Sequence, residues 1–216
     1  MNLSDNFFET INKISKNDFD HENINLFFDS AKYLLENASK KNQIKDKFTC
    51  FYYKPSTTLN CFLESEKTKS KYNLLYDIYK NEIVFYSDIL NWENIRNIND
   101  SFWQDFLATS KELNFQFNPH GGIIYDKETT PEFNSNYKSV IFNLMSVYVT
   151  SMLESEQQRE NISFGQLEIT WTPTKGITEI LKELNIAFKI FYKLNYLLWK
   201  TEDIRKQNQI NRRKNK

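Results

Sequence analysis

Glycine is scarce in this chain, and its scarcity argues against the commonest nucleotide-binding motifs. Only four glycines occur among the 216 residues, at positions 121, 122, 165 and 176. A Walker A loop or a G-x-G-x-x-G fingerprint needs closely spaced glycines, because the backbone must approach the phosphate groups. We therefore expect no conventional mononucleotide or dinucleotide site, although a phosphate group could still bind at a helix N-terminus.

Cysteine and histidine are equally rare. The chain has two of each, Cys50, Cys61, His21 and His120, and it contains no C-x-x-C pair, no H-E-x-x-H run and no G-x-S-x-G elbow. Compact zinc sites space their ligands more closely than these four residues are spaced. We therefore expect no metal and no cofactor, and we interpret the two cysteines as small core residues.

Secretion and membrane signals are lacking as well. The first eight residues form no basic region followed by a long apolar stretch, and there is no disulfide framework, so a reducing, cytoplasmic location is expected. The most apolar windows, 140–149 and 186–199, are interrupted by polar or charged residues. Both fall short of the roughly 20 apolar residues that a membrane-spanning helix needs, so we expect no membrane partner.

The chain does contain ample core material. It is 40% hydrophobic and 16% aromatic, and 28 basic residues balance 28 acidic ones, so no global charge attracts nucleic acid or a membrane surface. Its length fits a single core. We predict one globular α+β domain over residues 1–204 and a basic C-terminal tail over residues 205–216.

Apolar periodicity places the expected elements. The fold class that they predict is α+β, with a small, mostly antiparallel sheet covered by helices and a long, largely buried C-terminal helix. A capping-box signature at Ser101 and Gln104 marks one helix start. The expected strands are 48–53, 59–63, 83–86, 123–125 and 164–172, and the expected helices are 4–14, 22–40, 69–81, one from 101, 136–158 and one from 177.

Two residues are weak catalytic candidates. His120 precedes the chain's only Gly-Gly pair, and its side chain titrates in the range that suits proton transfer. Glu168 lies on the polar side of an alternating strand, where a metal-dependent nuclease often holds an acid, but Thr170 stands where such a core has lysine. We favour the simpler interpretations, a loop histidine and a solvated strand face.

One helical stripe and the C-terminus suggest partners. The stripe within 136–158 is small and uncharged, unlike an ordinary solvent-facing stripe, so it could pack inside the protein or form a protein interface; it comprises Ser139, Asn143, Ser146 and Thr150. The tail has cations and no acid, so it could bind nucleic acid in a salt-dependent way, or simply be a solvated helix end. Its candidate phosphate-binding residues are Arg205, Lys206, Arg212, Arg213 and Lys214.

Because enzyme motifs are lacking and two helices are unusually apolar, we expect a non-catalytic interaction protein. Its role would be that of a subunit or adaptor of a larger bacterial assembly, with a protein partner or a second copy bound to it. The alternative is a metal-dependent hydrolase or nuclease whose site is assembled from distant residues, among them His120. Such an enzyme would suit conflict with phages or mobile elements.

Overall fold

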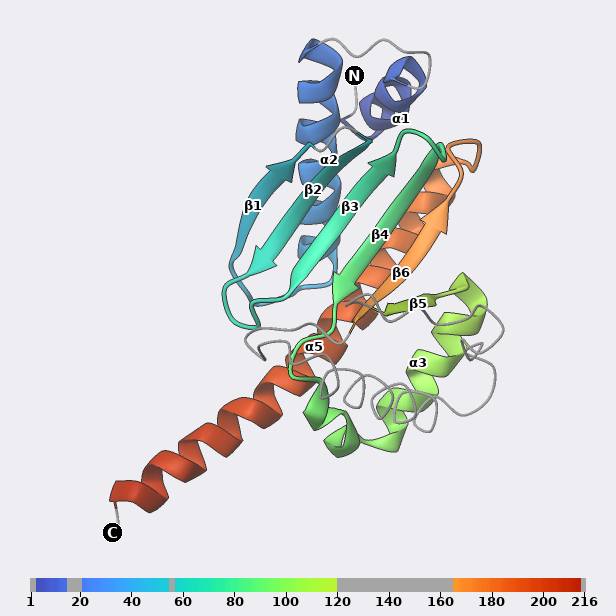
Figure 1. Cartoon of the computed structure of the whole chain (residues 1–216). Helices are drawn as coiled ribbons and strands as arrows, with labels where there is room; N and C mark the ends of the chain where they lie inside the picture. The colour runs from blue at the N-terminus through green and yellow to red at the C-terminus, as the bar shows by residue number, and fades with distance from the viewer. Residues whose placement is uncertain (1–2, 15–20, 55–56, 120–164, 215–216) are drawn as a thin grey trace, which may run out of the picture. The chain divides into compact units, whose positions relative to one another are not determined.

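The computed structural model of the chain describes residues 3–14, 21–54, 57–119 and 165–214 (Figure 1). Its fold class is α+β, as the sequence predicts. The helices of this part are α1 (Leu3–Ile14), α2 (His21–Lys41), the short 3₁₀ helix η1 (Trp92–Asn97), α3 (Asp100–Leu113) and α5 (Ile177–Lys214). The strands are β1 (Phe48–Tyr53), β2 (Thr58–Ser65), β3 (Lys71–Asp77), β4 (Glu82–Asp88), β5 (Gln116–Pro119) and β6 (Gly165–Trp171).

The described strands form one sheet in the order β1-β2-β3-β4-β6-β5. Its first four strands form an antiparallel meander, with Phe51 opposite Phe62 and Leu74 opposite Phe85. The chain divides into two compact units. The first contains residues 1–87 and 168–191, and the second contains residues 88–167 and 192–216.

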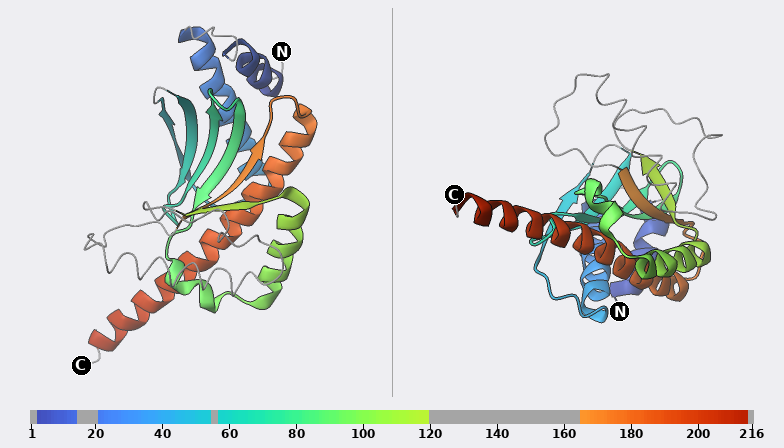
Figure 2. Two further views of the ribbon diagram at one scale, coloured as in Figure 1. Left: turned by 45° about the vertical axis from the view of Figure 1, so that its right-hand side comes forward. Right: turned by 90° about the horizontal axis from the view of Figure 1, so that it is seen from below.

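In the first unit, helices cover one face of the sheet (Figure 2). Side chains along each strand alternate between the two faces, and α2 and the first part of α5 cover one of them (Figure 1). This face carries Phe85, whose ring stacks on Phe188 of α5, and Leu74, which is opposite Phe85. Asn42, just after α2, donates a hydrogen bond from its side-chain amide to the carbonyl oxygen of Asn185 in α5, at 2.8 Å. This bond joins the two covering helices.

Phe188 of α5 occupies the centre of the first unit's core. Its ring stacks on Tyr72 with 4.9 Å between the ring centroids and on Phe85 at 5.8 Å, and it meets Phe48 edge-on at 6.1 Å. It is fully buried. A single side chain of α5 therefore contacts three different strands, which fixes the helix across the sheet.

The helix expected over residues 69–81 is wrong, because the segment forms β3 and the turn into β4. Tyr72, Leu74 and Tyr76 alternate into the core, and both neighbouring strands pair with β3 along its length. The turn is closed by Asn81, which has a positive φ of 54° and accepts a hydrogen bond from the Tyr76 hydroxyl at 2.8 Å. Asparagine tolerates this left-handed conformation better than most residues.

Two details of the α3 region also differ from expectation. The N-cap of α3 is Asn99, whose side chain accepts a hydrogen bond from the backbone N–H of Phe102, so Ser101 is not the cap. The short strand β5 after α3 was not predicted. The expected strand 123–125 and helix 136–158 lie outside the described residues.

The second unit includes η1, α3 and the later part of α5. Lys193 of α5 forms an ion pair with Asp105 at 3.6 Å and lies over the ring of Phe102 at 5.4 Å. Farther along, the Glu202 carboxylate accepts a hydrogen bond from Asn94 at 3.2 Å. These contacts join α5 to α3 and to η1. Within the described part of the chain, no helix is both long enough and apolar enough to cross a membrane.

Candidate interaction site

Strand β1 lies at one end of the sheet. Among the described residues it pairs only with β2, so its outer edge faces no other described strand (Figure 1). The edge of a sheet offers backbone N–H and C=O groups to an incoming strand, and natural proteins usually protect such an edge with charged residues or proline. From Phe48 to Tyr53 the strand has neither.

The side chains of β1 are aromatic and exposed. Phe51 is 42% exposed, Tyr52 46% and Tyr53 62%. Because Phe51 and Tyr53 are two residues apart on a strand, they lie on the same face of the sheet. This face is opposite the one that α2 covers. The three residues therefore place uncharged aromatic surface on both sides of an edge strand.

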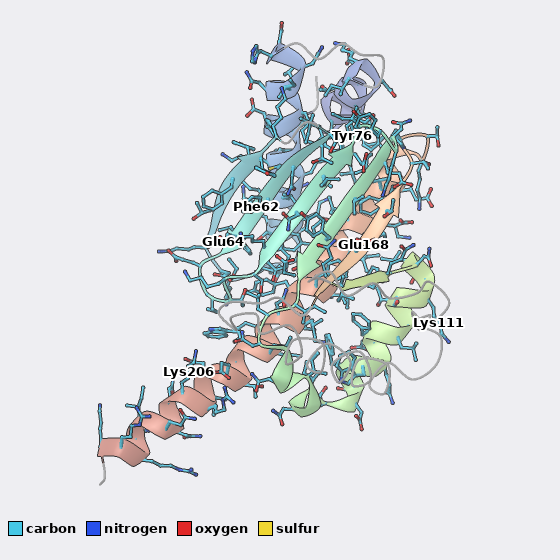
Figure 3. The ribbon with its side chains drawn as sticks, viewed as in Figure 1. Phe62, Glu64, Tyr76, Lys111, Glu168 and Lys206 are labelled. Atoms are coloured by element: carbon cyan, nitrogen blue, oxygen red, sulfur yellow. The ribbon has the colours of Figure 1, made fainter. Side chains whose placement is uncertain are left out.

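The aromatic surface continues from β1 onto β2. The ring of Phe51 stacks on that of Phe62, with 5.2 Å between the centroids and 23° between the ring planes. The ammonium group of Lys71 in β3 lies 5.3 Å from the centre of the Phe62 ring. Phe62 is labelled beside Glu64 in Figure 3. We call Phe51, Tyr52, Tyr53 and Phe62 the edge patch.

The side chains of two asparagines, one in β2 and one in β3, lie on the same face of the sheet as Phe62, next to the edge patch. The side chain of Asn60 donates to the side-chain oxygen of Asn73 at 3.0 Å and to the hydroxyl of Tyr86 at 3.2 Å. Both asparagines are buried, and Asn60 Oδ1 and Asn73 Nδ2 have no hydrogen-bond partner. The amide pair is therefore only partly satisfied, and its bonds connect β2 to β3 and to β4 on this face of the sheet.

On the other face of β1, Tyr52 contacts helix α2. Its ring centroid lies 4.9 Å from that of Phe28. Partial burial raises the pKa of the Tyr52 phenol, and a hydrogen bond to Cys50 adds to the rise. The phenol therefore stays protonated at neutral pH and can act as a hydrogen-bond donor.

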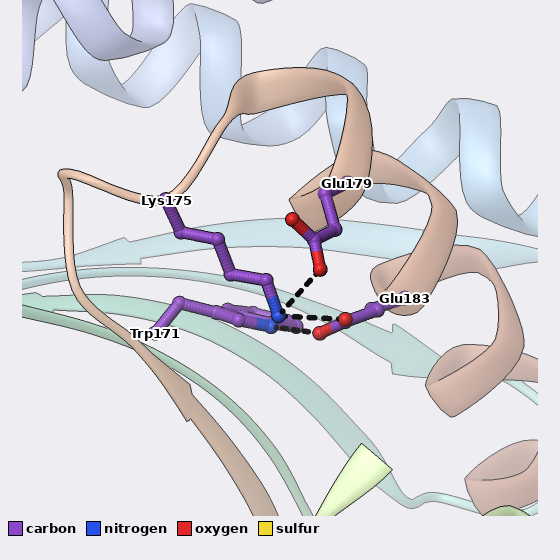
Figure 4. A network of polar contacts seen from close by, with 4 residues as sticks. All are labelled: Trp171, Lys175, Glu179 and Glu183. Carbon is purple, nitrogen blue, oxygen red and sulfur yellow. Dashed lines mark hydrogen bonds and ion pairs between the residues drawn. The ribbon is translucent and has the colours of Figure 1, made fainter. Parts of the chain in front are cut away.

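A separate polar network closes the connection from β6 to α5 (Figure 4). Glu183 accepts a hydrogen bond from the Trp171 indole at 2.7 Å and one from Lys175 at 2.6 Å, and Lys175 also forms an ion pair with Glu179 at 3.4 Å. The hydrogen bond to Glu183 raises the pKa of Lys175. Every charged group in this network has a partner. We therefore interpret the network as stabilising the turn rather than as a catalytic site.

The weak catalytic candidates are not brought together by the described structure. Glu168 lies in β6 between the buried Leu167 and Ile169, as the alternation predicts, and it is half-buried. No group of three or more His, Cys, Asp or Glu side chains within the described ranges could hold a metal ion. His120 lies outside those ranges. So does the proposed interface stripe, Ser139, Asn143, Ser146 and Thr150.

The predicted basic tail is helical. Residues 205–214 are the end of α5, and all of them are exposed. Arg205 contacts Glu202 at 2.8 Å, and Lys206 lies 3.6 Å from the same carboxylate. Burial raises the pKa of Glu202, but hydrogen bonds from Arg205 and Asn94 outweigh burial, so the net shift is downward. Two of the predicted phosphate-binding cations are therefore already near an acid.

Neither a protein-family model nor a curated protein or solved structure matches the chain at a significant level. The assignment of function therefore depends on the site itself.

Proposed function

We propose that the chain is a non-catalytic interaction protein, a subunit or adaptor of a larger assembly, and that its edge strand β1 binds a strand of a protein partner. The observation behind this proposal is the exposed, uncharged, aromatic outer edge of β1. Addition of a strand to a sheet edge gives affinity through main-chain hydrogen bonds, and the alternating side chains give specificity.

The exposed area suggests how strong such binding would be. An aromatic side chain buries about 150–250 Å², and roughly half of each of Phe51, Tyr52 and Tyr53 is still exposed. At about 25 cal/mol per Å², covering about 100 Å² on each of the three contributes about 7.5 kcal/mol in all. Association itself costs about 4–15 kcal/mol. Stable binding therefore also needs the main-chain bonds and Phe62.

A matched pair of substitutions tests the proposal. Tyr53→Lys places a charge on the edge patch, whereas Tyr79→Lys makes the same change at a tyrosine that is 81% exposed in the turn between β3 and β4. We expect Tyr53→Lys to reduce partner recovery in a native-level pull-down at least tenfold, and Tyr79→Lys to leave it unchanged. Circular dichroism of both variants checks that the fold is retained.

Light scattering on the wild-type chain identifies the partner class. A dimer that Tyr53→Lys dissociates would make a second copy of this chain the partner. A monomer with specific binding proteins in the pull-down would make the partner a different protein. Equal recovery by the two lysine variants, or a strict monomer with an empty pull-down, would refute the proposal.

A second function, nucleic-acid binding by the end of α5, is supported by one observation. Residues 204–214 contain five exposed cations and no acid. The hydrolase hypothesis stays a prediction, because His120 lies outside the described residues and no cluster of metal ligands occurs among the residues that the structure does describe.

A further inference from the structure

Cys50 and Cys61 lie on neighbouring strands with their sulfur atoms in contact. Cys50 is opposite Leu63 and Cys61 is opposite Tyr52, so the two cysteines are diagonal neighbours on the side of the sheet that faces the helices. Their Sγ atoms are 3.7 Å apart, and both cysteines are free. Diagonal neighbours in a sheet are close enough for side chains to interact.

The two thiols differ in exposure and in their electrostatic surroundings. Cys50 is half-buried, whereas Cys61 is fully buried. A hydrogen bond from Cys61 lowers the pKa of Cys50 to about 7; burial opposes this shift, while the Tyr52 hydrogen bond and the Lys32 charge support it. The same hydrogen bond, together with burial, raises the pKa of Cys61. At neutral pH Cys50 therefore has substantial thiolate character, while Cys61 keeps its proton.

We propose that Cys50 and Cys61 form a redox-active dithiol that hydroperoxides oxidise to an intramolecular disulfide. The Cys50 thiolate attacks a peroxide oxygen, which breaks the O–O bond, oxidises the sulfur to a sulfenic acid and releases the second oxygen as water or an alcohol. The Cys61 sulfur then attacks the sulfenic sulfur. Its proton leaves with the displaced hydroxide as water, so two thiols and one hydroperoxide give one disulfide.

The arrangement fits both steps. The nucleophile needs thiolate character and partial access to solvent, which Cys50 has. The resolving thiol needs proximity, which Cys61 has, and the hydrogen bond to the Cys50 thiolate that raises the pKa of Cys61 is lost once Cys50 is oxidised. Closing the bond requires the two sulfur atoms to move from 3.7 Å to about 2.05 Å apart. Diagonal neighbours lie about 7–8 Å apart and a disulfide needs less than about 7 Å between Cα atoms, so closing the bond also draws β1 toward β2.

Oxidation of the full-length wild-type chain with one equivalent of hydrogen peroxide at pH 7 tests the proposal without any substitution. We expect the free-thiol count to fall from two to zero and the intact mass to lose two hydrogen atoms. A non-reducing digest should link the peptides that contain Cys50 and Cys61, and dithiothreitol should reverse every change. Persistence of both thiols, or disulfide-linked dimers in place of the internal bond, would overturn the proposal.

Two variants test the order of the steps. Cys61→Ser removes the resolving thiol, so dimedone should trap a sulfenic acid on Cys50. Cys50→Ser leaves only the buried thiol, which should react with peroxide at least tenfold more slowly than the wild type. In the wild type, alkylation of Cys50 by iodoacetamide should reach half its maximal rate near pH 7. Preferential reaction at Cys61, or no trapped sulfenic acid in Cys61→Ser, contradicts the assignment of the nucleophile.

Discussion

Replacing Phe188 with alanine should remove the main contact between α5 and the sheet of the first unit. The side chain is 0% exposed, and three aromatic rings lie within 6.1 Å of its own, centroid to centroid. Deleting a buried Phe side chain costs about 3–5 kcal/mol of unfolding free energy, and each lost aromatic pair can add about 0.5–1.5 kcal/mol. We therefore expect a loss near the upper end, about 4–5 kcal/mol.

Urea unfolding followed by far-ultraviolet circular dichroism measures this loss. Folded domains are stable by about 5–15 kcal/mol, so the variant should have a much lower midpoint or be unfolded without denaturant. Phe188→Leu keeps most of the volume and should lose less than half as much. Lys189→Ala, at the exposed next position of α5, controls for helix propensity and should change little. A loss below about 1.5 kcal/mol for Phe188→Ala would refute the central role of this ring.

Two further predictions concern the second unit. Glu202→Ala should destabilise the protein by about 1–3 kcal/mol at pH 7, because the buried Asn94 amide loses its acceptor. Since the pKa of Glu202 is lowered in the folded state, its contribution is present above the unfolded pKa of about 4.3 and is lost as the pH falls through the lower folded value. The stability difference between the wild type and Glu202→Ala should therefore shrink as the pH falls below about 4.3, and a difference that stays constant into acid would contradict this. For nucleic acid, the four cations after residue 211 (Arg212, Arg213, Lys214 and Lys216) should give a slope of log affinity against log salt of about −4 on duplex DNA. All six cations of residues 205–216 would give about −5. Changing Arg212 and Arg213 to glutamine should weaken binding in a fluorescence titration, and salt-insensitive or unchanged binding would exclude the end of α5.

Much of the fold could be predicted from local periodicity. The starts of α2 and α5 and the hairpin of β1 and β2 lie within a few residues of their expected positions. β6 was recognisable because Leu167, Ile169 and Trp171 alternate with polar residues, and all three are buried. In such segments the apolar residues fit either the helical period of about 3.6 residues or the strand period of 2 much better than the other, so the local pattern and the tertiary structure agree.

β3 shows where local pattern is insufficient. Tyr72, Leu75, Tyr76 and Tyr79 have the spacing of a helical face, while Tyr72, Leu74 and Tyr76 have that of a strand. Hydrogen bonding to the neighbouring strands β2 and β4 selects the strand, and the period of the sequence does not reveal this pairing. Such pairing is a tertiary effect that overrides propensity. The cap of α3 is a similar case, since Asn99 and Ser101 are both good N-cap residues.

The candidate site could be predicted only in part. The sequence identifies residues 48–53 as an uncharged aromatic strand, but it does not identify which strand of a sheet lies at the end. Only the order of the strands shows that β1 is at the end of the sheet, and therefore that the exposed Phe51 and Tyr53 lie at a sheet edge. Likewise, no sequence spacing predicts that Cys50 and Cys61 touch, because their contact depends on the register of the hairpin.

The two proposals for β1 are separable because a strand has two faces. Phe51 and Tyr53 lie on the face away from α2, while Cys50 lies on the face toward it, where the Lys32 charge acts on its thiol. A partner strand would pair with the outer edge of β1 and cover Phe51 and Tyr53 on the first face and Tyr52, beside Cys50, on the other, without displacing either sulfur. An internal disulfide would in turn attach β1 covalently to β2 and reduce fraying of the edge. Oxidation is therefore expected to hold the edge strand in the conformation that a partner strand needs, rather than to compete with binding.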